Sequence, residues 1–323
     1  MTETPAWQLL AFVALLGGCR GCAPAPGTDA GPSEDAGPDG AEDAADDAEA
    51  PEGAEADGAA EVPSCPPDMV RVARRFCVDR YEASLVDAAS GRVLSPYYSP
   101  SRKYAVFIEK IWQSERMRVG DSEAQQMPLP ELPDWERKSD FEPRAVSAPS
   151  VVPSGYVSGE LAIVACRNAG KRLCTLDEWR TACRGEQDRQ FPYGDTHVLG
   201  RCNMFRESHP AFLLHGNAAK GHLDPRLNLV RYKGKPLLRK TGETPTCVSE
   251  WEGDGIRDMV GNLDEWIDDP EGTFVGGFYS RSKTDGCDSI VRFHPIEYFD
   301  YSLGVRCCSD LPAPDEPSTD GGG

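Results

Sequence analysis

The alternation of apolar and polar positions is clearest near residue 70. In the stretch 65–84, CPPDMVRVARRFCVDRYEAS, apolar side chains recur at every second position around Val70, Val72, Phe76 and Val78. A period of two places these side chains on one face of an extended chain. The pattern therefore predicts two short strands.

Two helices are predicted further along the chain. Residues 96–153 are rich in proline and polar residues without a clear period, so we expect loops with short elements there. Ser158 is placed to cap a helix over 159–168, and Thr175 with Glu178 forms a capping box that opens a second helix. The segments that follow are punctuated by glycine, as in a loop-rich α+β domain.

The first residues predict export. An apolar run over 7–18 is shorter than the roughly 20 residues that a membrane-spanning helix needs. It ends in Leu-Gly-Gly before Cys19, which is typical of a bacterial lipoprotein signal. We therefore expect 1–18 to be a signal peptide and Cys19 to be lipidated. Glu3 and the lack of a basic residue before the run leave an ordinary secretory signal, or a misplaced start codon, as the alternatives.

The next segment, 19–63, is expected to be a disordered tether. Between residues 23 and 63 it has thirteen acidic residues and no basic one, so it cannot bury apolar surface. Its 44 residues from 20 to 63 would span roughly 35 to 40 Å as a flexible coil. A folded domain is expected over 64–310 and a disordered tail over 311–323.

Charge excludes one class of partner. The net charge of the 323 residues is −19, and removing the thirteen acids of the tether leaves −6. No basic and aromatic cluster of the kind that binds nucleic acid is present in the sequence, so no nucleic-acid partner is expected. The predicted location is the bacterial cell envelope, periplasmic or at the surface, with the membrane reached through the lipid anchor.

Ten cysteines follow the tether. An even and dense set behind an export signal predicts disulfides. Zinc thiolates are the weaker alternative, because no Cys-x-x-Cys pair occurs within the domain and adjacent cysteines on a strand point in opposite directions. The cysteines are Cys65, Cys77, Cys166, Cys174, Cys183, Cys202, Cys247, Cys287, Cys307 and Cys308.

A family resemblance rests on six segments in order. They are FCVDRYEAS, AIVACRNAGKRLCTLDEWRTACRG, FPYGD, TCVSEWEGDGIRDMVGNLDEW, FVGGFYSRS and LGVRCC, within 69–308. Together they resemble the formylglycine-generating enzyme family, also called sulfatase-modifying factors. The resemblance implies a C-type-lectin-like α+β fold that is loop-rich and disulfide-bonded. The family includes copper-dependent oxidases that convert a sulfatase cysteine to formylglycine.

The resemblance implies a structural calcium site in DMVGNLDEW, 258–266. It gives Asp258 and Glu265 side-chain roles and gives Gly261 and Leu263 backbone carbonyl roles. Such a set suits Ca²⁺, which takes six to eight oxygen ligands. The alternative is a solvated acidic turn packed over a buried tryptophan.

A second calcium position of the family matches Asn203 and the carbonyl of Met204, with Asn217 near the expected distance. The family also implies two disulfides, Cys166 with Cys307 and Cys183 with Cys287. Proximity in the predicted arrangement suggests the remaining pairs, which are Cys65 with Cys77, Cys174 with Cys308, and Cys202 with Cys247.

The oxidase chemistry is not expected. The oxidases bind Cu(I) through two cysteines five residues apart, since soft thiolates suit this ion. Here Arg281 stands at the first position and Gly286 at the second, and Cys287 is one residue further on. Phe278 and Asp264 replace a serine and a tryptophan of the family pattern. We therefore expect no copper and assign no catalytic residue.

Iron is a weaker alternative cofactor, since some relatives of the family are grouped as non-haem iron enzymes. His209, His215 and His222 lie near Asp224, and two histidines with one carboxylate suit Fe(II). Steps of six and seven residues do not place the three histidines on one helix face. The loop 210–226 is nevertheless expected to form a wall of a pocket.

Three functional hypotheses follow. The first is a tethered, calcium-stabilised domain that binds an unknown protein or glycan at the cell envelope without oxidase chemistry. The second is an enzyme of the family with altered chemistry, of the oxidase or iron type, acting on an exported peptide or metabolite. The third is a true formylglycine-generating oxidase. Metal content separates them, because calcium alone favours the first, iron the second and copper the third.

Overall fold

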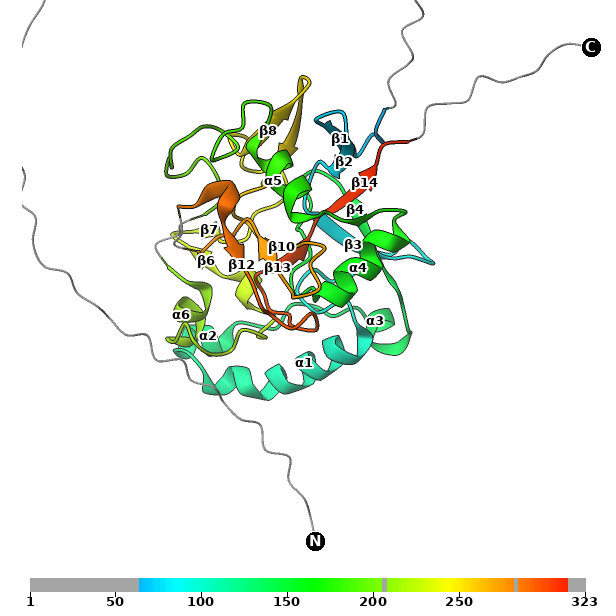
Figure 1. Cartoon of the computed structure of the whole chain (residues 1–323). Coiled ribbons are helices and arrows are strands. Elements are labelled where there is room, and N and C mark those ends of the chain that lie inside the picture. The colour runs from blue at the N-terminus through cyan, green and yellow to red at the C-terminus, as the bar shows by residue number, and fades with distance from the viewer. Residues whose placement is uncertain (1–63, 205–207, 282–283, 313–323) are drawn as a thin grey trace, which may run out of the picture. The chain divides into compact units, whose positions relative to one another are not determined.

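The computed structural model describes residues 64–204, 208–281 and 284–312 (Figure 1). The predicted signal peptide, Cys19, the tether and residues 313–323 of the predicted tail lie outside the described residues. None of the described helices has the length and apolar content to cross a membrane.

The helices are short except for α1. In chain order they are α1 (Arg102–Glu115), η1 (Arg116–Arg118), α2 (Ser122–Gln126), α3 (Asp134–Lys138), α4 (Gly159–Asn168), α5 (Leu176–Arg184), α6 (Pro210–His215), η2 (Leu227–Leu229) and η3 (Gly286–Asp288), where η marks a 3₁₀ turn.

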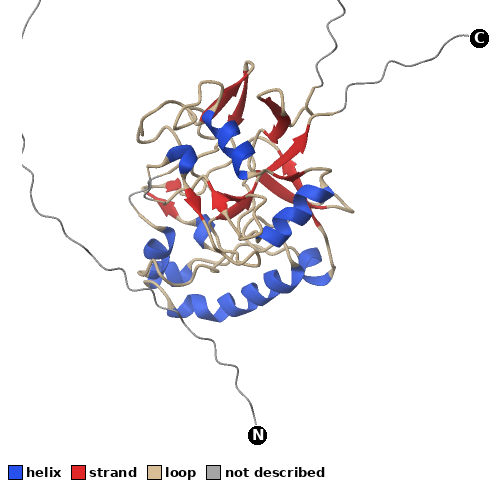
Figure 2. Ribbon diagram, in the orientation of Figure 1, coloured by secondary structure: helices blue, strands red, loops and turns tan. Residues whose placement is uncertain are grey.

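The strands form two four-stranded sheets and three two-stranded sheets (Figure 2). The first sheet has the order β1 (Met69–Val72), β2 (Phe76–Asp79), β14 (Cys307–Asp310), β5 (Arg172–Leu173). The second has the order β12 (Ile290–Val291), β11 (Phe274–Val275), β10 (Asp264–Trp266), β13 (Leu303–Val305). The pairs are β3 (Ala83–Asp87) with β4 (Pro143–Ser147), β6 (Arg231–Tyr232) with β7 (Lys235–Pro236), and β8 (Val248–Trp251) with β9 (Asp254–Arg257).

The local predictions for the first two strands and for the helices α4 and α5 are confirmed. The period-two stretch forms the antiparallel pair β1–β2. Ser158 caps α4 by accepting a hydrogen bond from the backbone N–H of Leu161 at 3.3 Å. Thr175 and Glu178 form the expected capping box at the start of α5.

The prediction for 96–153 is wrong in one respect, because this stretch contains the longest described helix, α1. Ala105, Ile108 and Trp112 recur at helical spacing and are buried in a core cluster with Tyr98 and Leu132. The flanking prolines and the many charged residues of the stretch obscured this pattern. Its other elements, η1, α2, α3 and β4, are short, as expected.

The ten cysteines form five disulfides, which confirms that they are paired. The two pairs implied by the family are formed, and so are the three suggested by proximity. Cys307 and Cys308 point to opposite sides of β14, because they bond to Cys166 in α4 and to Cys174 after β5. These two bonds close loops of 141 and 134 residues, which removes much conformational freedom from the unfolded chain.

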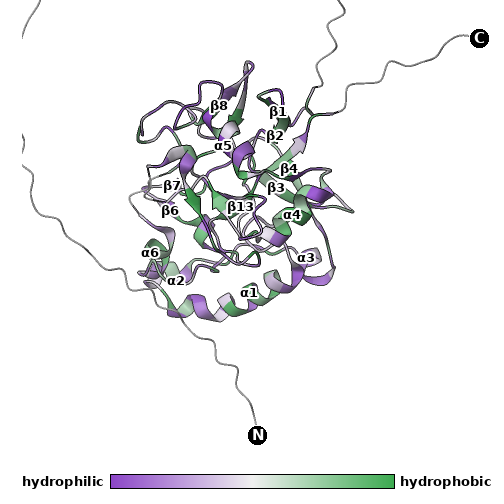
Figure 3. Cartoon of the chain, in the orientation of Figure 1, coloured by the Kyte–Doolittle hydropathy of each residue, from purple (hydrophilic) through white to green (hydrophobic). Residues whose placement is uncertain are grey.

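Apolar side chains fill the space between these elements. Figure 3 shows hydrophobic residues along central strands such as β13. Trp266 of β10 is 2% exposed, and its indole N–H donates to the carbonyl of Val157 at 2.8 Å. It is therefore the buried anchor that the sequence predicts for the end of the 258–266 loop.

Candidate functional site

The 258–266 loop is held by a close approach between two backbone segments. Gly261 has φ of +86°, and a Cβ there would lie 2.4 Å from the carbonyl oxygen of Asn203. Only glycine fits this position. The side-chain amide of Asn203 donates to the Asn262 side-chain carbonyl at 2.8 Å, and the backbone N–H of Asn262 donates to the Asn203 carbonyl at 2.9 Å. The two candidate calcium positions are therefore adjacent.

Glu265, the last acid of the loop, forms a buried ion pair with Arg306. The two groups are 2.8 Å apart, and both side chains have at most 1% exposure. The indole N–H of Trp179 donates to the other Glu265 oxygen at 2.7 Å. The guanidinium also donates to the carbonyls of Asp79 and Arg257, so its donors are well satisfied.

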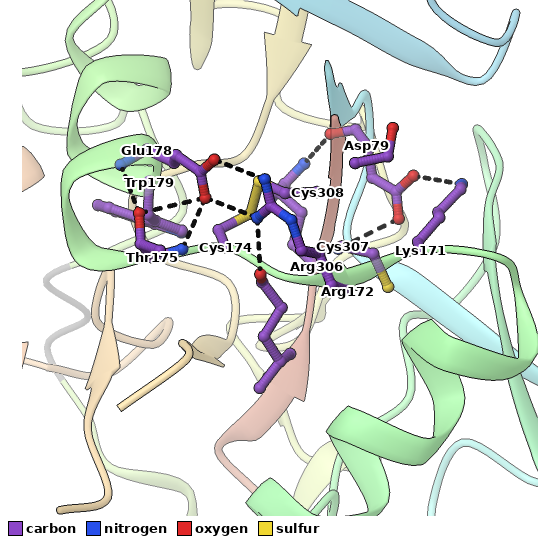
Figure 4. Close-up of a disulfide and its surroundings, with 12 residues drawn as sticks. Asp79, Lys171, Arg172, Cys174, Thr175, Glu178, Trp179, Arg306, Cys307 and Cys308 are labelled. Atoms are coloured by element: carbon purple, nitrogen blue, oxygen red, sulfur yellow. Dashed lines mark hydrogen bonds and ion pairs between the residues drawn. A yellow bond between two sulfur atoms is a disulfide. The ribbon is translucent and has the colours of Figure 1, made fainter. Parts of the chain in front are cut away.

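The surroundings of Arg306 tie the first sheet to helix α5 (Figure 4). Beside the Cys174–Cys308 disulfide, Arg172 of β5 donates to Glu178, the residue that completes the capping box of α5. On the other side, Lys171 bonds to the buried carboxylate of Asp79. Asp79 links the two networks, because its backbone carbonyl accepts a hydrogen bond from Arg306 at 2.9 Å.

Two further carboxylates lie near this ion pair. Glu82 accepts a hydrogen bond from the backbone N–H of Leu263 at 2.9 Å, and Asp258 accepts one from the N–H of Gly242 at 2.7 Å. Burial raises the pKa of Asp258 to about 6. Burial, and then the negative charges of Asp258 and Glu265, hold the pKa of Glu82 well above its usual value. Three buried acids thus share one guanidinium.

The negative charge of this cluster favours a calcium ion, but the oxygens of Glu265 that would bind it already accept hydrogen bonds. A divalent cation would offset the surplus of acid around Arg306. Both oxygens of Glu265, however, already accept hydrogen bonds from Arg306 and Trp179. The described residues include no group of three or more His, Cys, Asp or Glu side chains placed to hold a metal ion. Calcium at this loop therefore stays a prediction.

The second calcium position is likewise untested. The amide nitrogen of Asn203 also donates to the Leu237 carbonyl at 3.0 Å, and the residue is buried with Met204 beside it. The side-chain oxygen of Asn217 accepts from the N–H of Ala219, within its own exposed turn. The contacts of Asn217 are therefore local.

A second buried ion pair joins two of the departures from the family pattern. Arg281, after the Gly-Gly turn that follows β11, donates to the carboxylate of Asp264 in β10. Asp264 is fully buried, whereas 20% of the Arg281 side chain is exposed. The guanidinium also lies over the ring of Phe278, 5.3 Å from its centre. All three departures are thus in contact.

This ion pair has unused hydrogen-bonding capacity. Burial raises the pKa of Asp264 to about 6, while Arg281 acts to lower it and Asp300 to raise it. The Asp264 Oδ1 atom and the Arg281 Nε atom have no hydrogen-bond partner among the described residues. Both atoms are buried, so a ligand would reach them only when the partly exposed Arg281 side chain moves.

The turn that carries Arg281 leaves no room for a second thiolate. A Cβ at Gly286 would lie 2.2 Å from the carbonyl oxygen of Gln190, and φ there is +59°. A cysteine side chain does not fit this position without moving the backbone. Cys287 is bonded to Cys183 of α5, and so it is not a free thiol.

An aromatic wall continues from Phe278. Tyr301 packs edge-on against Phe278 with ring centres 5.6 Å apart, and its hydroxyl is 2.9 Å from His209 Nε2. The rings of His209 and His222 have centres 6.2 Å apart. Burial, and then the charge of His222, lower the pKa of His209, whereas Asp300 acts to raise it.

The histidines considered for iron do not converge. His215 pairs with Asp224 at 2.8 Å and stacks on Trp112 at 5.5 Å. Asp224 is also paired with buried Arg226. His209 belongs instead to the aromatic wall, so the structure separates the proposed iron ligands into two networks.

The loop 210–226 borders a cavity, as expected. A cavity of about 540 Å³ lies beside α2, α6 and η2. Leu213 and Leu214 of the loop line it together with Met127 and Val230, and Asp121 and Arg231 are at its polar parts. Most of the residues that line the cavity are apolar.

Several residues of the site escaped the sequence reasoning. Glu82 and Arg306 belong to segments that carry the family resemblance, but the sequence around them does not show that they face the 258–266 loop. Asp300 accepts from the Tyr298 hydroxyl at 2.7 Å and from Ser302, and its charge acts on Asp264. One signal in the sequence could have indicated the Arg281–Asp264 ion pair: the two residues that replace family residues at these positions have opposite charges.

A family model described as "Sulfatase-modifying factor enzyme 1-like domain" matches residues 51–292. No curated protein matches the sequence. Among solved structures, the I1 variant of Major Tropism Determinant is similar with a TM-score of 0.40 and 13% identity over 77% of this chain. This chain covers 54% of that one, so it spans about half of its length.

Two other solved structures are also similar. CarF has a TM-score of 0.35 and 12% identity, and the aligned region covers 73% of this chain and 87% of the CarF chain. PvdO from Pseudomonas aeruginosa has a TM-score of 0.35 and 12% identity, covering 73% of this chain and 80% of its own. At this level of similarity neither protein says what this chain binds or does.

Proposed function

Because the chain belongs to the sulfatase-modifying factor enzyme 1-like family, whose fold is C-type-lectin-like, we propose that it is a binding protein of the bacterial cell envelope that lacks the oxidase reaction. The Arg281–Asp264 ion pair carries this proposal. By the resemblance, these two residues stand where the oxidases have a copper-binding cysteine and a tryptophan. The site therefore has a fixed pair of charges in place of a metal ligand.

Arg281 cannot replace a thiolate. A guanidinium is permanently positive and has no lone pair to offer Cu(I). The crowding at Gly286 and the Cys183–Cys287 disulfide argue against a second thiolate on the same turn. These three observations support the loss of copper chemistry independently of one another.

The same ion pair suggests what the site binds. The partly exposed Arg281 side chain gives access to the pair, and a movement of this side chain would present the unpartnered acceptor on Asp264 and donor on Arg281 to a neutral group that both donates and accepts a hydrogen bond. A sugar hydroxyl and a peptide amide have this property. Phe278, Tyr279 and Tyr301 are buried in a core cluster beside the pair, so they support the Arg281 side chain from beneath. The proposed ligand is accordingly a glycan or an extended peptide.

Anchoring through Cys19 is the second part of the proposal. The Leu-Gly-Gly-Cys sequence supports lipidation at this residue. Five disulfides are typical of proteins that mature in an oxidising compartment outside the cytoplasm. No specific contact favours the alternative of a metal-dependent enzyme, since the described residues form no metal cluster.

Two assays test the proposal. Full-length protein is incubated with Cu(I), oxygen and a Cys-x-Pro-x-Arg peptide, and mass spectrometry should find no formylglycine. Copper-dependent turnover that a Cys287→Ser change abolishes would make Cys287 catalytic and end the proposal.

Binding is then measured against an oligosaccharide array and a library of extended peptides. Arg281→Met should weaken whichever interaction is found, whereas Arg292→Met, at a more exposed arginine, is the matched control. An interaction indifferent to Arg281→Met would place the binding surface elsewhere.

A further inference from the structure

Helix α1 has two neighbouring apolar stripes, and only one of them is buried. Ala105, Ile108 and Trp112 face the core. Tyr104, Phe107 and Ile111 each stand one residue before a member of the buried set and have the same spacing. Their exposed fractions are 40%, 57% and 37%. Residues at these spacings share one face of a helix, so the exposed side chains form a continuous stripe.

The exposed stripe lies at the edge of the domain. In Figure 1, α1 runs along the lower edge of the domain, and the other labelled elements lie above it. Tyr104 touches Phe299 with ring centres 5.3 Å apart, while Phe107 points away from the core. An apolar stripe of this kind on an otherwise polar helix surface is a candidate contact surface.

Two lysines flank the stripe. Lys103 and Lys110 are one helical turn before and after Phe107, on the side away from the buried face. Both are exposed and form no ion pair among the described residues. The other charged groups of the helix are neutralised, since Arg102 pairs with Asp140, Glu109 with Arg137, and Glu115 with Arg118.

We propose that this face of α1, Lys103, Tyr104, Phe107, Lys110 and Ile111, docks on the surface of an anionic lipid bilayer. Helices that lie in a membrane interface combine aromatic and aliphatic side chains with flanking lysines. Anionic headgroups attract each lysine, and the apolar side chains enter the boundary with the acyl chains.

The choice of a bilayer rests on the lipid anchor proposed above. From Cys19 to the described domain there are 44 intervening residues, and a chain of that length can bring the domain back to the membrane that holds Cys19. The uncompensated positive charge of Lys103 and Lys110 complements a negative surface, although the domain as a whole is mildly acidic. A second copy of the chain is also acidic, and its dependence on protein concentration distinguishes it from a bilayer in the test below.

The test is hydrogen–deuterium exchange of the full-length protein with vesicles of phosphatidylglycerol and phosphatidylcholine. Amides of 102–115 should exchange more slowly with these vesicles than without them. The double variant Phe107→Ser, Ile111→Ser should lose the protection. The control variant Phe293→Ser removes an aromatic side chain outside α1 that is 73% exposed, and in this variant α1 should still be protected.

Further arms identify the source of the effect. Lys103→Glu with Lys110→Glu should lose the protection, and vesicles of phosphatidylcholine alone should give less of it. Unchanged exchange in the wild type, or equal protection of the double variant, overturns the proposal. Protection that grows with protein concentration in the absence of lipid identifies a second copy and also overturns it.

The lipid anchor is tested separately with Cys19→Ala in the same experiment. If this variant is not anchored in cells yet α1 is still protected by added vesicles, the docking surface stands. If the wild type is anchored but α1 shows no protection, docking fails while the anchor stands.

Discussion

Arg281 and Asp264 are paired across β10 and the turn after β11, so two residues that each depart from the family pattern compensate one another. Either charge alone would be costly at this position, because Asp264 is fully buried. The two charges therefore stabilise one another, and the pairing can be dissected by mutation.

Removal of one partner should destabilise the domain more than removal of both. Arg281→Met leaves the Asp264 carboxylate buried without a counter-charge, which should lower the free energy of unfolding by about 3 kcal/mol. The double variant Arg281→Met, Asp264→Leu should recover part of this loss. Urea unfolding of the wild type, both single variants and the double variant gives the coupling energy. Additive effects would mean that the two charges do not interact in solution.

Cys19→Ala tests the predicted lipid anchor. Cys19 follows the small residues that end the apolar run, so its loss should block processing or release the protein from membranes. Fractionation of cells and mass spectrometry of the N-terminus measure both effects. Cys22→Ala is the matched control, since this cysteine lies three residues further on. Unchanged fractionation and processing of the Cys19 variant would contradict lipidation.

Sequence reasoning succeeded where the signal is local. The caps at Ser158 and Thr175 fix the starts of α4 and α5 through hydrogen bonds within three residues, and the two strands near Val70 follow from their period of two. The disulfides followed from the number of cysteines and from the resemblance. Such signals depend little on the rest of the fold.

The remainder depends on packing between distant segments. Arg306 meets Glu265 because β13 runs parallel to β10 and leads the chain back beside it. Arg281 meets Asp264 only after the Gly-Gly turn has folded. Helix α1 was missed because prolines and charged residues surround it and because some of its apolar side chains face solvent, which weakens its pattern. These relations are properties of the tertiary structure.

Calcium should stabilise the protein if it binds at the 258–266 loop. A ligand at 100 times its dissociation constant raises the free energy of unfolding by about 2.7 kcal/mol. We expect the melting temperature to rise with calcium and to fall with a chelator, and Asp258→Ala should abolish the difference. Glu271→Ala, at an exposed acid on a nearby turn, is the control. Equal melting temperatures of the wild type with and without calcium would leave Arg306 as the sole counter-charge of Glu265.

The last prediction concerns pH and Glu136 of α3. This glutamate is 1% exposed and accepts a hydrogen bond from the N–H of Ser95 at 2.9 Å. Burial raises its pKa from 4.5 to about 7, although Ser95 and Arg137 act in the opposite direction. The folded protein therefore binds this proton more tightly than the unfolded chain does.

The sign of the effect follows from that difference. Between about pH 4.5 and pH 7 the folded state holds more protons than the unfolded state, so the stability contributed by Glu136 falls as pH rises through this window. Glu136→Gln keeps an oxygen for the N–H of Ser95 and removes the titration. It should be more stable than the wild type at pH 8 and should lose less stability between pH 5 and pH 8. Urea unfolding at the two pH values measures this, with Glu131→Gln, at an exposed glutamate just before α3, as the control. A pH dependence of Glu136→Gln equal to that of the control would show that Glu136 is ionised in the folded protein throughout the window.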